Sequence, residues 1–318
     1  MSTPAPRQPL QTNSHPLPAP HIPAYYPQDQ SRTDFNTIAS CILHPETSSV
    51  DDVAATLATQ INSGDVTLPD DDARHPANRT IQIFTSVVEI AIQTPWDHVA
   101  QLRLVGLLKA LRRQPGPPEN VREAIRESDG SAGDFTWASL PTFSFLTHEL
   151  WDYHVPLPGH ATRVAGPGWS VKEWLNYNGF LSLLLAERVS EACQPGLGFE
   201  MLALRCLCLA LEYDLGVAEL GAMVQAAAMW SLNAGEWVRR ACDGGLMIGA
   251  RVQNLGRKLY HGPEGFCAER WEFWMRRFEE IAIGDGVRVE TVGWALRAAE
   301  VMEGMGLIGR RVQVAKTL

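Results

Sequence analysis

The stretch WSVKEWLNYNGFLSLLLAE, residues 169–187, contains the clearest local signal in the chain. Ser170 and Glu173 form an S-x-x-E capping box, in which each side chain bonds the backbone N–H of the other residue at the start of a helix. Trp169 and Trp174 occupy the two positions of a hydrophobic staple around the same start. The helix that follows is apolar on nearly every side, which is typical of a helix enclosed by others. The sequence therefore predicts a core helix here, inside a bundle.

The flanking sequence also has the periodicity and punctuation of helices. Ser48 or Ser49 can cap one helix, Pro76 opens another, and Gly262-Pro263 indicates a third start. Together with these starts, the periodicity predicts helices over residues 34–43, 76–93, 96–113, 118–127, 137–154, 200–213, 217–242, 263–282 and 289–305. Gly306 is expected to end the last of them, and the stretch 244–261 is ambiguous. No strand-length alternation and no repeat of 20–50 residues is present. The sequence predicts an all-α fold, a single irregular multi-helix bundle of about eleven helices.

The N-terminal segment has a different composition from the rest of the chain. Residues 1–33 hold eight of the 21 prolines and few branched aliphatic side chains. Such a segment buries too little apolar surface to offset the entropy lost on ordering, so we expect a disordered arm. A linker is the simpler role for it, and a docking or phosphorylated tail is the alternative. Residues 34–318 are then predicted to form one all-helical domain.

Composition limits the partners and the compartment. The net charge of −9 disfavours nucleic-acid binding, which needs a basic surface to displace phosphate counterions. Six cysteines in 318 residues are too few for a disulfide scaffold, and the N-terminus lacks a signal-peptide pattern. The nearly charge-free segment 201–211 is too short to span a bilayer. We expect an intracellular protein, cytoplasmic or nuclear, that does not enter a membrane.

Signatures of known chemistries are absent from the sequence: there is no P-loop, no Rossmann glycine motif, no nucleophile elbow and no CxxC pair. One near match is His148-Glu149-Leu150-Trp151-Asp152, which has the spacing of a zinc-binding H-E-x-x-H helix with Asp in the second ligand position. His154 or His160 could add a ligand. An amphipathic helix with a polar side is the simpler interpretation, so we predict no metal and no cofactor.

A polar pocket between core helices is the best candidate for a small-ligand site. Asn178 lies on the apolar core helix, and Arg205 and Glu212 lie two turns apart on the next apolar helix. Buried polar groups need partners, so these three side chains either line a pocket or hold the bundle in register. The pocket hypothesis makes the protein an enzyme of unknown type or a ligand-binding module. No nucleophile, general base or substrate can be named from the sequence.

The segment HGPEGFCAERWEFWMRRFEEIA, residues 261–282, suggests a partner surface. Most of its aromatic residues lie on one apolar face of the expected helix, as core residues do. Phe273 instead projects among charges, one heptad after Phe266, with Arg270 and Arg277 beside it. Either another element covers this side, or Phe266, Arg270, Phe273 and Arg277 form an exposed aromatic–basic strip that a partner could bind.

Five stretches together resemble one family: TWASLPTFSFLTHELWD (136–152), EWLNYNGFLSLLLAE (173–187), LCLALEYD (207–214), AAAMWSLNAGEWV (226–238) and HGPEGFCAERWEFWMRRF (261–278). The family is an uncharacterised group of helical proteins from filamentous ascomycete fungi, defined by a domain of unknown function. The resemblance covers about residues 136–280 and implies an α-helical fold and a fungal source, but no activity.

Taken together, these observations favour a non-catalytic intracellular module that binds a protein or a small ligand through its helices. The alternative is an enzyme of unknown type with a polar pocket around Asn178, Arg205 and Glu212. An exposed aromatic–basic strip would support the first hypothesis, and a solvent-reachable cavity joining the three polar residues would support the second.

Overall fold

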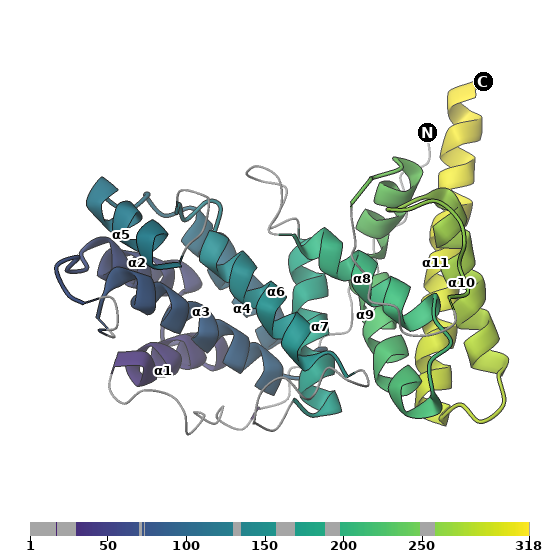
Figure 1. Ribbon diagram of the computed structural model, residues 1–318, viewed down its shortest axis with the longest axis horizontal. Coiled ribbons are helices and arrows are strands. Elements are labelled where there is room, and N and C mark those ends of the chain that lie inside the picture. The colour runs from purple at the N-terminus through teal and green to yellow at the C-terminus, as the bar shows by residue number, and fades with distance from the viewer. Residues whose placement is uncertain are drawn as a thin grey trace.

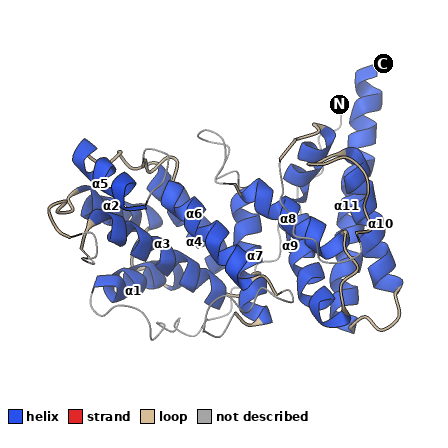
Figure 2. Ribbon diagram, in the orientation of Figure 1, coloured by secondary structure: helices blue, strands red, loops and turns tan. Residues whose placement is uncertain are grey.

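The computed structural model describes residue 17 and residues 30–69, 72, 74–129, 135–156, 169–187, 198–248 and 258–317. These ranges contain eleven α-helices and no β-strand, apart from one isolated antiparallel bridge between Tyr213 and Lys258, so the predicted all-α fold is confirmed (Figure 2). Most of the predicted disordered arm lies outside the described residues. Its last four residues, 30–33, belong to the first helix. None of the described helices is long and apolar enough to cross a membrane.

Six helices form one end of the long axis of the molecule (Figure 1). They are α1 (Gln30–Leu43), α2 (Val50–Asn62), α3 (Pro76–Gln93), α4 (Val99–Arg112), α5 (Glu119–Asp129) and α6 (Pro141–His154). Helix α3 packs against α1, α5 and α6, and α2 packs against α4. This end is therefore organised around α3.

The other end of the molecule holds four helices: α8 (Phe199–Leu211), α9 (Val217–Asp243), α10 (Ala268–Ile283) and α11 (Val289–Thr317). Helix α9 packs against α8 and α11, and α11 packs against α10 (Figure 1). Helix α7 (Val171–Ala186) lies between the two ends and contacts α3 and α4 on one side and α8 and α9 on the other. It is the helix that joins the two halves.

The sequence explains why α7 can take this central place. The predicted capping box is confirmed: Glu173 N donates to Ser170 Oγ (3.3 Å), and Ser170 N donates to Glu173 Oε2 (2.7 Å). Beyond this cap, side chains on every side of the helix are buried. Gly179 allows the closest approach, because a Cβ there would lie 2.5 Å from Cβ of Trp96 in the α3–α4 connection. A larger residue would push α7 away from α3 and α4.

A buried ion pair joins the first three helices. Asp34 of α1 and Arg79 of α3 are both buried, and both Nη atoms of Arg79 contact the Asp34 carboxylate, with Nη2 to Oδ1 at 3.0 Å. Arg79 Nη2 also donates to Gln60 Oε1 of α2 (2.7 Å). Residue 34 thus lies inside the packed structure.

Two predicted helix ends are wrong. Helix α10 begins at Ala268 rather than at Pro263, because Gly265 takes a left-handed φ of +69° and Phe266 N donates to the backbone oxygen of Leu246 (2.9 Å). Helix α11 continues through Gly306 to Thr317. A glycine inside a helix costs only about 1 kcal/mol, so Gly306 alone does not end α11.

Candidate functional site

Asn178 lies at the centre of a cluster of tryptophans and is fully buried. Its Oδ1 accepts hydrogen bonds from the indole nitrogens of Trp151 (3.2 Å) and Trp230 (3.0 Å). Its Nδ2 donates to the backbone oxygen of Trp174 (2.9 Å). These bonds join α6, α7 and α9 at one point. The sequence did not show which groups the Asn178 amide bonds. In the structure this amide holds three helices together.

Arg205 lies at the edge of this cluster rather than beside Asn178. Its guanidinium carbon is 4.8 Å from the centre of the Trp151 ring, and Nη2 contacts Asp152 Oδ1. Both partners belong to α6, so Arg205 joins α8 to α6. Its Nε is buried and has no hydrogen-bond partner within the described part of the chain. Trp151 is thus the link between Arg205 and Asn178.

Glu212 lies at the other end of α8 and pairs with Arg270 of α10. Only 1% of Glu212 and 5% of Arg270 is exposed. Arg270 Nε lies 2.7 Å from Oε1, and Nη2 donates to Oε2 (3.2 Å). The Nε–H bond does not point towards Oε1 well enough for a hydrogen bond. The contact between Nε and Oε1 is therefore mainly an attraction between opposite charges. The contact at both carboxylate oxygens fixes the start of α10 against the end of α8.

Aromatic and thiol groups surround this pair. Trp274 Nε1 donates to Glu212 Oε1 (2.9 Å), and the Cys208 thiol donates to the same oxygen (3.4 Å). Burial, followed by the nearby Glu212 carboxylate, holds the pKa of Cys208 well above its usual range, so it stays a thiol. The Arg270 guanidinium lies 4.7 Å from the centre of the Tyr260 ring. Every charged group of this cluster therefore has a partner.

The predicted ligand pocket is thus divided. Asn178 and Arg205 belong to the tryptophan cluster, and Glu212 belongs to a separate ion pair two turns away along α8. Sequence reasoning left Glu212 either lining a pocket or holding the bundle in register, and it left Arg270 either covered or part of an exposed strip. The structure pairs the two side chains. Glu212 stood out as a charge on an apolar helix, whereas Arg270 was expected on the charged side of its helix and gave no signal for this pairing.

The aromatic–basic strip is not exposed as a whole. Phe266 is fully buried between Trp237 (ring centres 5.7 Å apart) and Trp274 (6.2 Å), and Arg270 is buried in the ion pair. Phe273 is half-buried against Tyr260, with ring centres 5.2 Å apart. Tyr260, two residues after the bridge residue Lys258, thus lies against this side of α10, next to Phe273 and Arg270.

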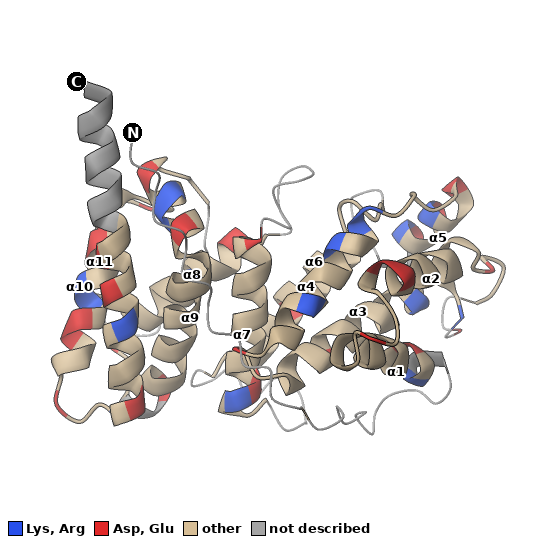
Figure 3. Cartoon of the chain, turned by 180° about the vertical axis from the view of Figure 1, so that it is seen from behind, with Lys and Arg blue, Asp and Glu red and all other residues tan. Residues whose placement is uncertain are grey.

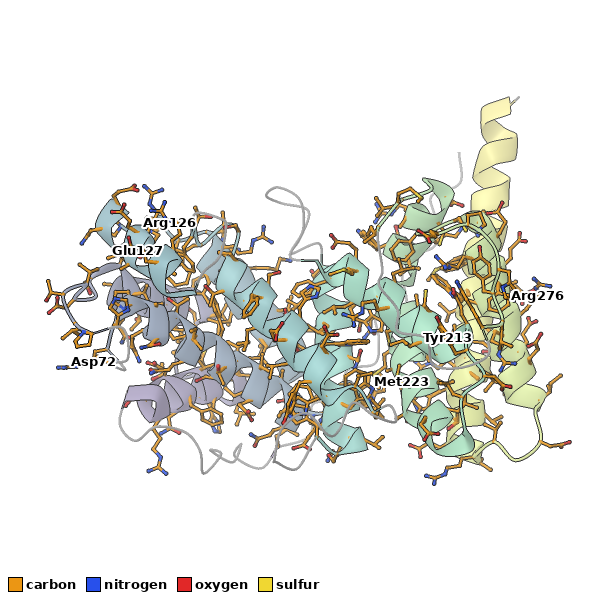
Figure 4. The ribbon with its side chains drawn as sticks, in the orientation of Figure 1. Asp72, Arg126, Glu127, Tyr213, Met223 and Arg276 are labelled. Carbon is orange, nitrogen blue, oxygen red and sulfur yellow. The ribbon has the colours of Figure 1, made fainter. Side chains whose placement is uncertain are left out.

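Arg277 remains at the edge of the same helix and pairs with Glu280 (3.0 Å). By contrast, Arg276 points away from the body of the molecule (Figure 4).

The near match to a zinc helix does not form a ligand cluster. Asp152 is engaged by Arg205, and the ring of His148 packs against Gly198, where a Cβ would lie 2.5 Å from His148 Nε2. His154 stacks on Trp169, with ring centres 3.8 Å apart, and His160 lies outside the described residues. Within the described ranges no three His, Cys, Asp or Glu side chains are grouped so as to hold a metal ion.

A feature that sequence reasoning missed lies at the α10–α11 connection. Ile283, the last residue of α10, is 83% exposed, and Val289, the first residue of α11, is 88% exposed. They are the two most exposed large apolar side chains in the described part of the chain. Leu296, two turns further along α11, is 46% exposed. We call Ile283, Val289 and Leu296, together with the turn between the helices, the hairpin tip.

Charged side chains of both signs flank the hairpin tip. Glu279, Glu280, Asp285 and Glu290 are all exposed, and so are Arg288 and Arg297. Figure 3 shows acidic residues on α10 and in the turn to α11, with basic residues among them. The tip therefore combines exposed apolar side chains with charged neighbours of both signs. The signal for it was two aliphatic residues flanking the Asp285-Gly286 turn.

The comparisons with known proteins identify a family without a function. A family model described as "Protein of unknown function (DUF3632)" matches residues 84–278. The match includes α4 to α9 completely and ends within α10. It begins in α3, well before the segment 136–280 in which the resemblance was found from the sequence. No curated protein and no solved structure matches the chain.

Proposed function

The chain belongs to the DUF3632 family of proteins of unknown function, and we propose that it is a non-catalytic helical module that binds a partner protein. The observation that carries this proposal is the hairpin tip, where Ile283 and Val289 are 83% and 88% exposed. Single exposed aliphatic residues are ordinary, but here two nearly bare ones stand at the two ends of one short turn. Each would contribute roughly 1.5–3 kcal/mol if a partner buried it completely.

The buried polar clusters support a non-catalytic role. The acceptor oxygens of Asn178 and Glu212 are occupied by tryptophan, cysteine and arginine side chains of the protein itself. A substrate would have to displace these partners from inside the core. The enzyme hypothesis, with Asn178, Arg205 and Glu212 lining a pocket, rests on Arg205, whose buried Nε has no hydrogen-bond partner among the described residues.

The proposal includes an intracellular location, in the cytoplasm or the nucleus of a filamentous ascomycete. The free thiols of Cys41, Cys206, Cys208, Cys242 and Cys267 support a reducing compartment. The fungal source rests on the sequence resemblance alone.

Proximity labelling in cells tests the proposal, with the wild type compared with the double variant Ile283→Ser/Val289→Ser. A matched control replaces two exposed apolar residues elsewhere, Phe145→Ser/Met247→Ser. We expect at least one partner to be lost with the tip variant and kept with the control. Equal labelling by all three proteins would contradict binding through the hairpin tip.

A further inference from the structure

Two cysteines lie where α9 ends and α10 begins. Cys242 belongs to the last turn of α9 and is only 2% exposed, whereas Cys267 immediately precedes α10 and is partly exposed. Both are free thiols. A reagent in solution can therefore reach the sulfur of Cys267, while the sulfur of Cys242 is shielded from it.

Contacts on either side of the two cysteines bring their segments together. On the α9 side, the guanidinium carbon of Arg239 lies 5.4 Å from the centre of the Trp271 ring. Beyond the end of α9, the N–H of Phe266 donates to the backbone oxygen of Leu246 (2.9 Å). Gly265 tightens this contact, because a Cβ there would lie 2.6 Å from the same oxygen. Each cysteine therefore lies between two residues that contact the segment of the other.

The two residues also contact each other directly. Burial, followed by the neighbouring Cys267 thiol, raises the pKa of Cys242 to about 12, and a hydrogen bond between the Cys267 backbone and the Cys242 sulfur offsets a part of this rise. On its other side, the sulfur of Cys267 lies 3.2 Å from the hydroxyl oxygen of Tyr260. The Cys242 sulfur is thus held next to the residue whose sulfur is accessible.

We propose that Cys267 is a site of oxidation by peroxides, and that its oxidised sulfur forms a disulfide bond with Cys242 that joins the end of α9 to the start of α10. The inference is independent of the hairpin tip, since it concerns the opposite end of α10. In a reducing compartment such a bond is transient, because the thiol pool returns it to two thiols. The pair would therefore respond to oxidant rather than serve as a permanent cross-link.

The reaction has two steps. The Cys267 sulfur attacks one oxygen of hydrogen peroxide and the O–O bond breaks, so that the sulfur is oxidised to a sulfenic acid and the other oxygen leaves as water with the thiol proton. The Cys242 sulfur then attacks the oxidised sulfur, the S–O bond breaks, and the hydroxide leaves as water with the proton of the second thiol. Because the attacking sulfur is held beside its target, the second step does not depend on diffusion.

Peptide mapping of the full chain tests the proposal. Trypsin cuts after lysine and arginine, which leaves Cys242 as the single cysteine of the peptide 241–251 and Cys267 as the single cysteine of the peptide 259–270. The reduced protein is treated with hydrogen peroxide, its free thiols are blocked with N-ethylmaleimide, and mass spectrometry follows digestion without reductant. We expect the two peptides to be joined by a disulfide in protein that remains a monomer on a non-reducing gel, and to separate after dithiothreitol.

Three variants assign the steps. Cys242→Ala should leave the sulfenic acid of Cys267 unresolved, so that dimedone labels the peptide 259–270, whereas Cys267→Ala should give neither the label nor the linked pair. Cys41→Ala removes another buried thiol, on α1, and should leave the linked pair at the wild-type level.

The wild-type result decides the proposal without any substitution. Peroxide-treated wild type in which both thiols remain free would overturn it. So would a Cys267 sulfur that passes to the sulfonic acid without a linked pair, or one that is linked to a cysteine other than Cys242.

Discussion

Replacing Arg270 with methionine should destabilise the protein by about 3 kcal/mol, because the Glu212 carboxylate would remain buried without its cation. Breaking a buried ion pair typically costs about 3–5 kcal/mol, and the two side chains here are only 1% and 5% exposed. The indole nitrogen of Trp274, 2.9 Å from Oε1, would still donate to the carboxylate. The remaining donor is the reason to expect the lower end of the range.

Urea unfolding followed by tryptophan fluorescence measures this loss, and two variants calibrate it. Arg277→Met removes a nearby pair at the edge of the same helix, with 62% of the Glu280 side chain exposed, and should cost no more than about 1 kcal/mol. The double variant Glu212→Gln/Arg270→Met removes both charges and keeps an acceptor for Trp274. It should recover most of the loss and leave a deficit of about 1 kcal/mol.

Hydrogen exchange gives the local result. The amide of Leu259 donates to the backbone oxygen of Glu212 (2.7 Å), so it should lose protection in Arg270→Met before the helices unfold. The reasoning is refuted if Arg270→Met costs as little as Arg277→Met, or if the double variant is no more stable than the single one.

Three further predictions follow from the buried groups. Asn178→Leu leaves two buried indole N–H groups without an acceptor and should cost about 2–4 kcal/mol in urea unfolding, and a loss below 1 kcal/mol would show that water replaces the amide. Burial lowers the pKa of His154 to about 4, below the unfolded value of 6.5. The contribution of the neutral imidazole to the free energy of unfolding should therefore be fully present above pH 6.5 and be lost as the pH falls towards 4. After solvent screening, this loss should be roughly 1–2 kcal/mol. A His154→Leu variant with an equally steep pH dependence would contradict this. In a Cys193→Ser background, Cys267 should react first with a thiol reagent, while Cys242, buried and with a pKa raised to about 12, should react only on unfolding.

Local signals predicted local structure well. The Ser170–Glu173 capping box fixed the start of α7, because its bonds join residues three positions apart. The start of α10 was predicted wrongly because it depends on a long-range contact: Phe266 bonds to Leu246, and Gly265 turns the chain ahead of the helix. The Gly262-Pro263 pair predicted an earlier start of the helix, and the long-range contact prevents it.

The candidate site was predicted less well than the fold, for the same reason. Asn178 and Glu212 stood out in the sequence as polar residues on apolar helices, whereas Arg270 was one of several charges on an amphipathic helix. Their partners come from helices 27 to 62 residues away, and periodicity does not specify which helix packs against which. Ile283 and Val289 gave no signal of exposure in the sequence, because single aliphatic residues occur both in cores and on surfaces.

Hydrogen–deuterium exchange on the full chain, with and without a partner protein identified by the proximity labelling, tests the binding role of the hairpin tip most directly. We predict that the partner slows exchange in residues 279–296, from the last turn of α10 through the first two turns of α11, and leaves α6 and α8 unchanged. Protection centred on Arg205 between α6 and α8, with none at the hairpin tip, would contradict the account and favour a ligand site in the core.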